Sequence, residues 1–331
     1  MTELNRRQLF AGAATAAAAA ALSQCEITGA KAAIAPAGAQ APGFYRYKVG
    51  AYECTSINDG ARSFPLPDTF VTNVPKAEAA AAAEAAYMPQ GMVTVPFNPQ
   101  LINTGSKLIL IDCGNGIAAY EPSKGAVGRT LQNLQAAGVD PKSIDIVLMS
   151  HLHPDHTNGI RAADGSMAFP NAEIMVPAAE WKFWMDDANL NAAPADLKLT
   201  FRNQRRIFAD IAASVARFEP GAEVSPGIVT IPAPGHTPGH TVFAIHSGDA
   251  SLLVLGDTAQ HPAVFARHPD WQAAFDIDGE AAVATRKALF DRAAADRMLV
   301  TGYHFPFPAC GHLIKTAGGY EHVPVEWQPN L

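Results

Sequence analysis

The feature that constrains this chain most is a histidine-rich segment at residues 149–159. Three imidazoles and one carboxylate lie there within six residues: His151, His153, Asp155 and His156. They follow the apolar run 144–149, which predicts a buried strand. Buried polar groups need partners, and an apolar layer cannot supply four. A divalent cation can, because imidazole nitrogen and carboxylate oxygen suit borderline metals. The segment therefore predicts a metal-binding loop at the end of a strand.

Three later segments also place a histidine or an aspartate directly after a predicted strand. His236 follows the run 228–232, Asp257 follows 252–255, and His304 follows 298–302. Loops at the carboxyl ends of strands are where rigid scaffolds present ligands. Three histidines would satisfy a single metal, so the extra ligands indicate a second ion. We expect seven side chains to meet on one edge of the sheets: His151, His153, Asp155, His156, His236, Asp257 and His304.

The rest of the chain alternates short β-branched runs with amphipathic stretches. The predicted strands are 44–49, 52–57, 92–97, 107–112, 144–149, 173–176, 228–232, 241–246, 252–255 and 298–302. The predicted helices are 76–87, 127–137, 178–187, 197–216 and 280–295. Asp59-Gly60 and Thr104-Gly105 predict tight turns between strands. This order predicts a layered α/β or α+β body, in a single domain at 40–331, with helices outside and sheet inside.

Residues 1–39 have the features of a bacterial export signal. Arg6 and Arg7 precede an apolar run at 9–22, and the small residues 37–39 supply a cleavage site. The run is shorter than the roughly 20 residues that span a bilayer, so we do not expect a stable membrane anchor. The paired arginines resemble the twin-arginine signal, which exports folded proteins and predicts a periplasmic location. A lipoprotein site at Cys25 is disfavoured because Gln24 stands where a small residue is expected.

Charge and cysteine content exclude several classes of function. The chain carries 24 Lys and Arg against 31 Asp and Glu, a net charge of -7. This balance repels phosphate backbones, so nucleic acid is not an expected partner. After removal of 1–39, the cysteines are Cys54, Cys113 and Cys310, which allow at most one internal disulfide. The chain is not a disulfide scaffold.

The order of these motifs resembles one known family. His-x-His-x-Asp-His at 151–156, then Pro-Gly-His, then Gly-Asp and a late His are similar to the metallo-β-lactamase fold superfamily. The resemblance runs from about Phe44 to the C-terminus. It implies an α+β layered αββα sandwich, with two mixed sheets inside and helices outside. Within the superfamily, the segments 41–46, 103–108, 236–241 and 305–308 resemble methyl parathion hydrolase and the quorum-quenching lactonases.

The resemblance implies a dinuclear site. It assigns the seven side chains to two divalent ions: His151, His153 and His236 to one, Asp155, His156 and His304 to the other, and Asp257 to both. A hydroxide shared by the two ions would be the nucleophile, because metal binding lowers the pKa of water toward about 7. Zn is the ion we expect, although Mn, Co or Fe suit the same ligands. Asp155 is also the candidate to relay a proton, and we expect His240 to orient a loop instead of binding metal.

Two positions bear on the substrate. The best-known β-lactamases of the superfamily have a thiolate where this chain has Asp257, so a penicillin is a less favoured substrate. The lactonases tend to carry a tyrosine three positions later, where it can help the leaving group, and this chain has Gln260. We therefore expect a metal-dependent hydrolase acting on a small, partly apolar ester: an organophosphate triester, an aryl ester or a lactone. The alternatives are a β-lactamase, a dedicated N-acyl homoserine lactonase, and a metal-binding protein without turnover.

The resemblance also suggests pocket walls and an assembly. Tyr120, Trp184 and Phe201 fall where the resembling hydrolases place aromatic walls of the substrate pocket, although core packing fits each of them equally well. The sequence leaves the oligomeric state open, although those hydrolases are often dimers and a homodimer is one candidate assembly.

Overall fold

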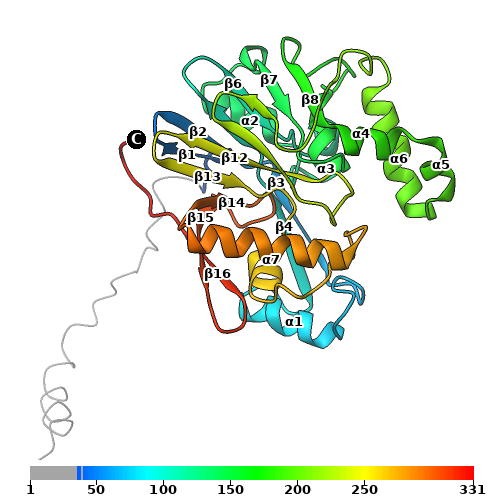
Figure 1. Ribbon diagram of the computed structural model, residues 1–331, viewed down its shortest axis with the longest axis vertical. Helices are drawn as coiled ribbons and strands as arrows, with labels where there is room; N and C mark the ends of the chain where they lie inside the picture. The colour runs from blue at the N-terminus through cyan, green and yellow to red at the C-terminus, as the bar shows by residue number, and fades with distance from the viewer. Residues whose placement is uncertain (1–35, 39) are drawn as a thin grey trace, which may run out of the picture. The chain divides into compact units, whose positions relative to one another are not determined.

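Two mixed sheets lie at the centre of the computed structural model, which describes residues 36–38 and 40–331 (Figure 1). The first sheet contains, in order, β1 (Phe44–Val49), β2 (Tyr52–Ile57), β5 (Gln100–Asn103), β6 (Leu108–Ile111), β7 (Ile146–Leu148), β8 (Glu173–Pro177) and β9 (Ala216–Phe218). The second contains β10 (Glu223–Ser225), β11 (Ile228–Pro232), β12 (Thr241–Ser247), β13 (Ala250–Val254), β14 (Leu299–Thr301), β15 (Cys310–Lys315) and β16 (Tyr320–Pro324). The strands β3 (Gly60–Pro65) and β4 (Met92–Phe97) form a separate ribbon.

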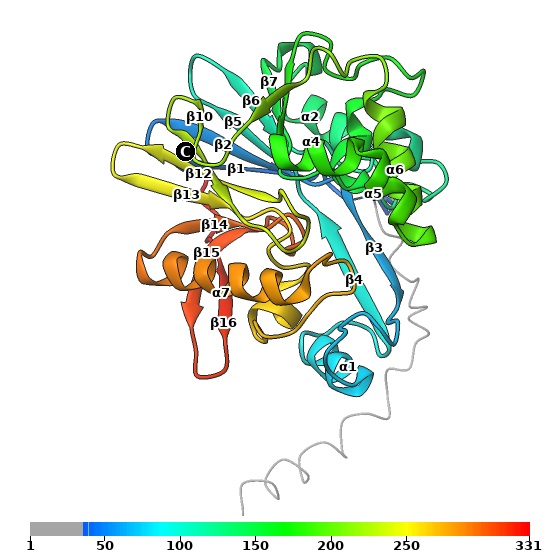
Figure 2. The same ribbon diagram turned by 45° about the vertical axis from the view of Figure 1, so that its right-hand side comes forward.

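Helices cover the outer faces of both sheets. The helices are α1 (Lys76–Ala85), α2 (Thr130–Ala136), α3 (Pro154–Thr157), α4 (Ala178–Met185), α5 (Asp187–Ala192), α6 (Ala195–Phe208) and α7 (Gly279–Ala295). Side chains of α2, α4 and α6 share one apolar core with the first sheet, and those of α1 and α7 share another with the second. Figure 2 shows the β3–β4 ribbon reaching from the sheets to α1. The predicted αββα sandwich is confirmed.

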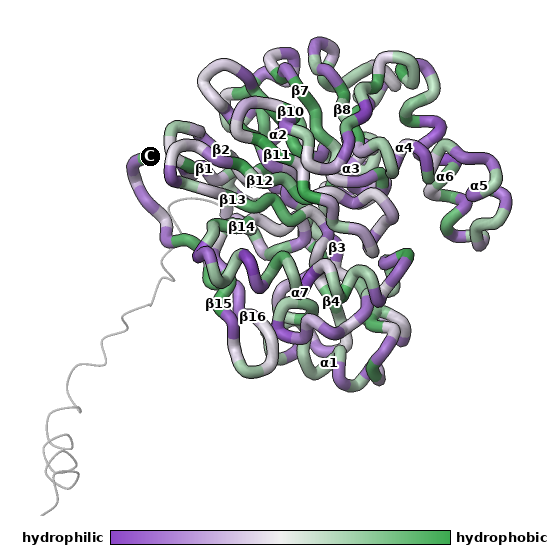
Figure 3. Tube along the Cα trace, in the orientation of Figure 1, coloured by the Kyte–Doolittle hydropathy of each residue, from purple (hydrophilic) through white to green (hydrophobic). Residues whose placement is uncertain are grey.

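The two-residue period of the strands separates three apolar cores. On β12, Val242 and Ala244 face the core under α7, whereas Phe243 and Ile245 face the space between the sheets. Successive side chains of a strand point to opposite faces, so a strand covered on both sides is apolar throughout. Figure 3 accordingly shows hydrophobic stretches on central strands such as β7 and β12. Each such side chain contributes about 1.5–3 kcal/mol on burial.

Strand direction places the predicted ligands together. β6, β7 and β8 are mutually parallel. In the second sheet β12 is antiparallel to both β11 and β13, and β13 is parallel to β14. β11, β13 and β14 therefore run in one direction, and their carboxyl ends meet at one edge. The loops that leave β7, β11, β13 and β14 carry all seven predicted ligands.

Most predicted elements are present, with one helix too long. The predicted strands 44–49, 52–57, 92–97 and 228–232 coincide with β1, β2, β4 and β11. The predicted helix 197–216 is wrong in its second half, because α6 ends at Phe208. The chain beyond it keeps a helix-favouring composition, but 216–218 pairs with β8 and extends the first sheet as β9. Tertiary pairing overrides local propensity there.

The two predicted turns have different outcomes. Thr104-Gly105 joins β5 to β6, and Asn103 pairs with Leu108 across that hairpin. Asp59-Gly60 does not join two paired strands, because β2 pairs with β1 and β5 while β3 pairs with β4. Asp59 is buried, and its carboxylate accepts hydrogen bonds from the backbone of Asn115, Gly128 and Thr130. It anchors loops instead of forming a surface turn.

The N-terminal prediction lies almost wholly outside the described part of the chain. The predicted export signal at 1–39 includes only 36–38 among the described residues. Residues 42–331 form one unit by their internal contacts. Among the described residues, no helix combines the length and the apolar character needed to cross a membrane.

Candidate metal centre

The seven predicted ligands converge in two groups that share one carboxylate. The first group is His151, His153, His236 and Asp257, and the second is Asp155, His156, Asp257 and His304. Within each group the ligand atoms all lie within 4.8 Å of one another. Asp155 and His156 belong to the short helix α3, whereas the other residues lie on loops after β7, β11, β13 and β14.

The first group directs ring nitrogens at a common point. His153 Nδ1 lies 3.0 Å from His151 Nε2 and 2.9 Å from His236 Nε2. His151 Nδ1 donates to Ser150 Oγ at 3.0 Å, since that hydroxyl already donates to the Asp112 carboxylate. An imidazole that donates through one nitrogen presents a lone pair on the other. His151 therefore offers the lone pair of Nε2 to the centre.

The second group has the same arrangement. His156 Nδ1 donates to Asp112 Oδ2 at 2.8 Å, and His304 Nδ1 donates to the carbonyl oxygen of Pro96 at 2.8 Å. The Nε2 lone pairs then face carboxylate oxygens, because His156 Nε2 lies 3.1 Å from Asp257 Oδ1 and His304 Nε2 lies 2.9 Å from Asp257 Oδ2. Asp155 Oδ2 is 3.6 Å from both of these nitrogens.

These contacts fit a pair of cations. Two acceptors that face each other at about 3 Å repel unless a proton or a cation lies between them. His156 Nε2 and Asp257 Oδ1 are buried and have no hydrogen-bond partner. Nitrogen and carboxylate ligands suit zinc and related divalent ions. Asp257 faces both groups, because its Oδ2 lies 3.2 Å from His236 Nε2 and 2.9 Å from His304 Nε2. The residues present therefore match the predicted dinuclear ligand set.

Burial and charge set the protonation of the metal-free site. Burial lowers the pKa of His151 and of His153 well below 6.5, which keeps both rings neutral as metal ligands must be. Burial opposes the charged form of His236 too, but the carboxylates of Asp257 and Asp276 raise its pKa to about 9. The charges of His304 and His156 outweigh burial and hold the pKa of Asp257 well below its usual range.

His240 supports a ligand loop. Its Nδ1 donates to the carbonyl oxygen of Ala233 at 3.1 Å, and its Nε2 accepts the backbone N–H of Asp257 at 3.0 Å. Both ring nitrogens are therefore occupied by backbone groups, and His240 has none left for a metal. This is the loop-orienting position that the sequence predicts for it.

Glu180, on α4, ties two ligand loops together and was missed by the sequence analysis. Its Oε2 accepts the backbone N–H of Leu152 at 3.0 Å and the indole N–H of Trp184 at 2.8 Å. Its Oε1 accepts the backbone N–H of Gly239 at 2.7 Å. Leu152 lies between two ligands, and Gly239 lies on the loop that carries His236. A polar residue among apolar neighbours at 178–185 was its only sequence signal.

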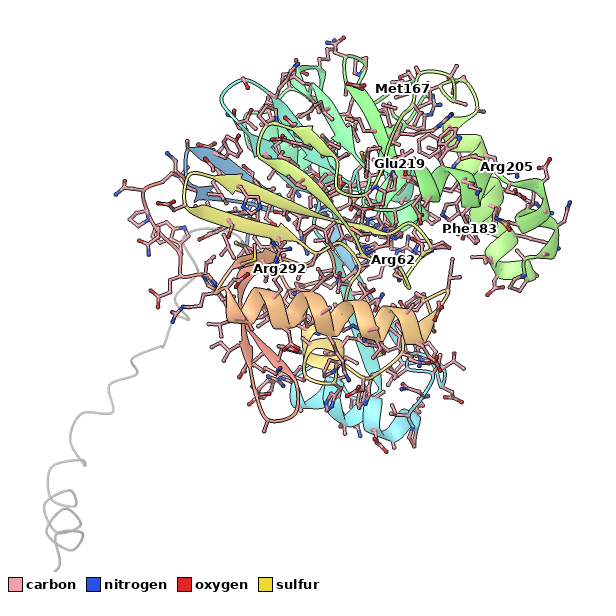
Figure 4. All side chains as sticks on the ribbon, in the orientation of Figure 1. Arg62, Met167, Phe183, Arg205, Glu219 and Arg292 are labelled. Atoms are coloured by element: carbon pink, nitrogen blue, oxygen red, sulfur yellow. The ribbon has the colours of Figure 1, made fainter. Side chains whose placement is uncertain are left out.

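The predicted aromatic walls occupy different depths. Trp184 is fully buried, and its ring centre lies 5.7 Å from that of His153. Phe201 is also fully buried and packs against Trp184 at 4.6 Å. Phe183, which is not among the predicted wall residues, is half-buried with its ring centre 5.0 Å from that of Trp184, and Figure 4 labels it in the helical part of the molecule. Tyr120 is half-buried, with the Arg129 guanidinium over its ring at 5.4 Å.

Comparison with known proteins agrees with this geometry. The family model described as the metallo-beta-lactamase superfamily matches residues 98–302, which include six of the seven ligands. A probable metallo-hydrolase of Mycobacterium bovis is 24% identical over 184 residues, covering 49% of this chain and 56% of the relative. The chain thus spans just over half the length of that relative.

Two solved structures are similar over most of the chain. A hydrolase of the β-lactamase superfamily, AbOPH, superposes with a TM-score of 0.80 at 29% identity, covering 88% of this chain and 100% of that one. AidC, a dizinc quorum-quenching lactonase in complex with its product, has a TM-score of 0.80 at 28% identity, covering 86% and 98%. These relatives agree with the metallo-hydrolase class that the motifs predict. By its matched residues, its αββα layers and its ligand order, the chain belongs to the metallo-β-lactamase superfamily.

Proposed function

We propose that this protein is a dinuclear metal hydrolase of a small, partly apolar ester. The observation that carries the proposal is the shared Asp257 carboxylate, which lies between two complete groups of nitrogen and oxygen ligands. Two divalent ions, most simply Zn, would supply a water activated at neutral pH and would polarise the ester oxygen under attack.

Asp155 is the ligand best placed to handle a proton. Its side chain is 26% exposed, whereas the side chains of Asp257 and His304 are each 4% exposed. A carboxylate at the open side of the site can accept a proton from the attacking water and pass it to the leaving group or to solvent. The buried histidines instead hold a fixed geometry, because their other nitrogens are occupied by Asp112, Ser150 and backbone carbonyls.

Gln260 favours esters with good leaving groups. It is 2% exposed, and its Nε2 lies 3.3 Å from His236 Nδ1, next to the first ligand group. The Gln260 amide can donate a hydrogen bond but cannot give up a proton, whereas a tyrosine phenol at this position could. A strongly basic alkoxide leaving group therefore gains less help from Gln260 than it would from a tyrosine. Aryl esters and organophosphate triesters leave as weakly basic anions and need little protonation. They are the proposed substrates.

A lactonase is the second candidate. The similarity to AidC over 86% of this chain favours it, because that protein is a lactonase with two zinc ions. A Gln260→Tyr variant separates the two candidates. We expect it to raise kcat/KM for an N-acyl homoserine lactone relative to an aryl ester. An unaltered chain that already prefers the lactone over aryl and phosphate esters would establish the second candidate.

The decisive experiment combines metal analysis with a substrate panel. The chain without residues 1–39 is loaded with zinc and its metal content is measured. Hydrolysis of an organophosphate triester, a nitrophenyl ester, an acyl homoserine lactone and a penicillin is then compared. We expect two ions per chain and the highest kcat/KM for either the organophosphate triester or the nitrophenyl ester. Full activity with one ion would refute the dinuclear proposal. Full loading without hydrolysis of any compound would support a metal-binding protein without turnover.

We further propose that the chain is exported to the periplasm by the twin-arginine route. The proposal rests on Arg6 and Arg7 ahead of the apolar run 9–22. Replacing both arginines with lysine in the full-length chain should leave it in the cytoplasm after cell fractionation. Unchanged appearance in the periplasmic fraction would refute this route.

A further inference from the structure

We infer that Asp276 and Arg286 are positioning residues for the metal centre: together they fix the ring of His236 and the loop that carries Asp257. The inference rests on the proposed metal site, since it concerns how the chain holds two of that site's ligands. Neither residue belongs to a ligand motif, and both have fully buried side chains.

Asp276 sets the orientation of His236. Its Oδ1 lies 2.9 Å from His236 Nδ1 and accepts that N–H. A carboxylate in this position fixes the tautomer, so that Nε2 keeps its lone pair for the metal and becomes a better donor to it. Asp276 Oδ2 accepts the backbone N–H of Ala273 at 3.2 Å and lies 3.7 Å from Arg286 Nη2. Both carboxylate oxygens are thereby held.

Arg286 links this carboxylate to the second ligand loop. Its Nε donates to the carbonyl oxygen of Thr258 at 2.7 Å, and its Nη1 donates to those of Trp271 at 2.7 Å and Pro269 at 3.0 Å. Thr258 directly follows Asp257. A buried guanidinium needs a counter-charge, and Asp276 is the carboxylate that faces it. The planar fork of arginine reaches several acceptors at once, which a lysine ammonium does not do.

The backbone around Asp276 clamps the same loop. Ile277 N donates to the carbonyl oxygen of His236 at 3.0 Å, and Asp278 N donates to that of Gly235 at 2.9 Å. Gly235 has a φ of +127°, and a Cβ there would lie 2.1 Å from the backbone nitrogen of Ala282 on α7. The start of α7 and the His236 loop are therefore in direct contact, and no larger residue fits between them.

The two positioning residues have different expected effects. Among the seven ligands, Asp276 contacts His236 of the first group. The second-group ligands His156 and His304 have their own partners in Asp112 and the Pro96 carbonyl. Changing Asp276 should selectively weaken the binding of the ion at the first group. Arg286 also holds the loop that carries Asp257, the ligand shared by both groups. Changing Arg286 should therefore weaken the binding of both ions.

The test measures zinc affinity at each site by competition with a chromophoric chelator. Asp276→Asn keeps the volume and one acceptor but places an NH₂ group against the Ala273 N–H and Arg286. Asp276→Ala removes both acceptors. The matched controls are Asp296→Asn and Arg292→Lys, which alter an exposed pair 3.9 Å apart. Arg292 (labelled in Figure 4) lies on α7, the helix that carries Arg286, and Asp296 caps the end of that helix.

We expect Asp276→Asn to weaken one of the two sites by about 10- to 100-fold and to leave the other unchanged. Asp276→Ala should weaken the same site further, Arg286→Met should weaken both, and Arg286→Lys should weaken both by less. The control variants should match the unaltered chain. The absorption spectrum of the cobalt-loaded protein should change for Asp276→Asn at the affected ion only.

Two results would overturn the inference. One is unaltered affinity at both sites in Asp276→Asn. The other is equal weakening of both sites in that variant together with a lower melting temperature of the metal-free protein, since this would mean a general packing role. If Asp276→Ala does not fold, the isosteric Asn variant still decides between these results. Failure of the unaltered chain to bind zinc would instead refute the proposed function itself.

Discussion

Replacing Glu180 with glutamine tests whether one buried carboxylate holds two ligand loops together. The side chain is fully buried and accepts three hydrogen bonds, from Leu152 N, Gly239 N and the indole of Trp184. A glutamine has one oxygen. If that oxygen keeps the hydrogen bonds from Leu152 N and the Trp184 indole, the NH₂ group faces the N–H of Gly239. The buried N–H of Gly239 then has no acceptor.

The expected cost follows from these three contacts. A buried donor without an acceptor costs about 1–3 kcal/mol, and each remaining bond loses about 1 kcal/mol when its acceptor is no longer charged. Burial raises the pKa of Glu180, so removing the charge recovers part of this loss. The net loss in the free energy of unfolding is roughly 2–4 kcal/mol. At about 2 °C per kcal/mol for a large domain, the melting temperature should fall by about 4–8 °C.

The assay is thermal unfolding of the chain without residues 1–39, with a chelator present, followed by zinc titration. The matched control is Glu84→Gln, an exposed glutamate on α1, which should change the melting temperature by less than about 1 °C. Zinc affinity should fall in Glu180→Gln because the loops of His153 and His236 are no longer joined. A melting temperature and an affinity equal to those of the unaltered chain would refute the role given to this carboxylate.

Three further outcomes test the site and the fold. His151→Ala and Asp257→Ala should each lower zinc content and activity together, whereas His240→Ala should lower them much less; a His240 variant as poor in metal as the His151 variant would contradict the ligand assignment. Because the metal-free His236 has a pKa raised to about 9, zinc must displace its proton below that pH. Apparent affinity should therefore rise with pH and level off above about 9, and calorimetry in two buffers should detect proton release. Phe290→Ala, in the core under α7, should cost about 3–5 kcal/mol in denaturant unfolding without changing activity per folded molecule.

The sequence predicts which side chains converge because they follow strands. An apolar run followed by a polar loop is a local feature of the sequence. The runs 144–149 and 228–232 therefore predict the loops that carry His151 and His236. Asp112 follows the strand β6 in the same way and holds His156. Asp112 lies at the carboxyl end of β6, at the same edge of the first sheet as the loop after β7, so the same reasoning also identifies Asp112.

The residues behind the ligands have no local signature. Asp276 is 40 positions from His236, and Glu180 is 59 positions from Gly239. Each is an acidic residue in an otherwise ordinary segment, and its role appears only when the layers pack. The strands β15 and β16 were missed for a related reason. They are the last two strands on one side of the second sheet, with β16 at its edge, and both expose part of their surface, so their hydrophobic pattern is weak.

The acceptor contacts of the site also link metal binding to folding. Without cations, the fold brings His304 Nε2 to 2.9 Å from Asp257 Oδ2 and leaves His156 Nε2 buried without a partner. In the metal-free chain protons lie between such facing groups, since neighbouring carboxylates raise the pKa of His156 and of His236. The hydrogen bonds of Asp112, Glu180 and Asp276 hold the groups in place around them. A cation that binds the folded chain alone stabilises it by about 2.7 kcal/mol at a hundred times its dissociation constant. The cation must displace these protons, so affinity depends on pH, while the outer hydrogen bonds keep the ligands together before the metal binds.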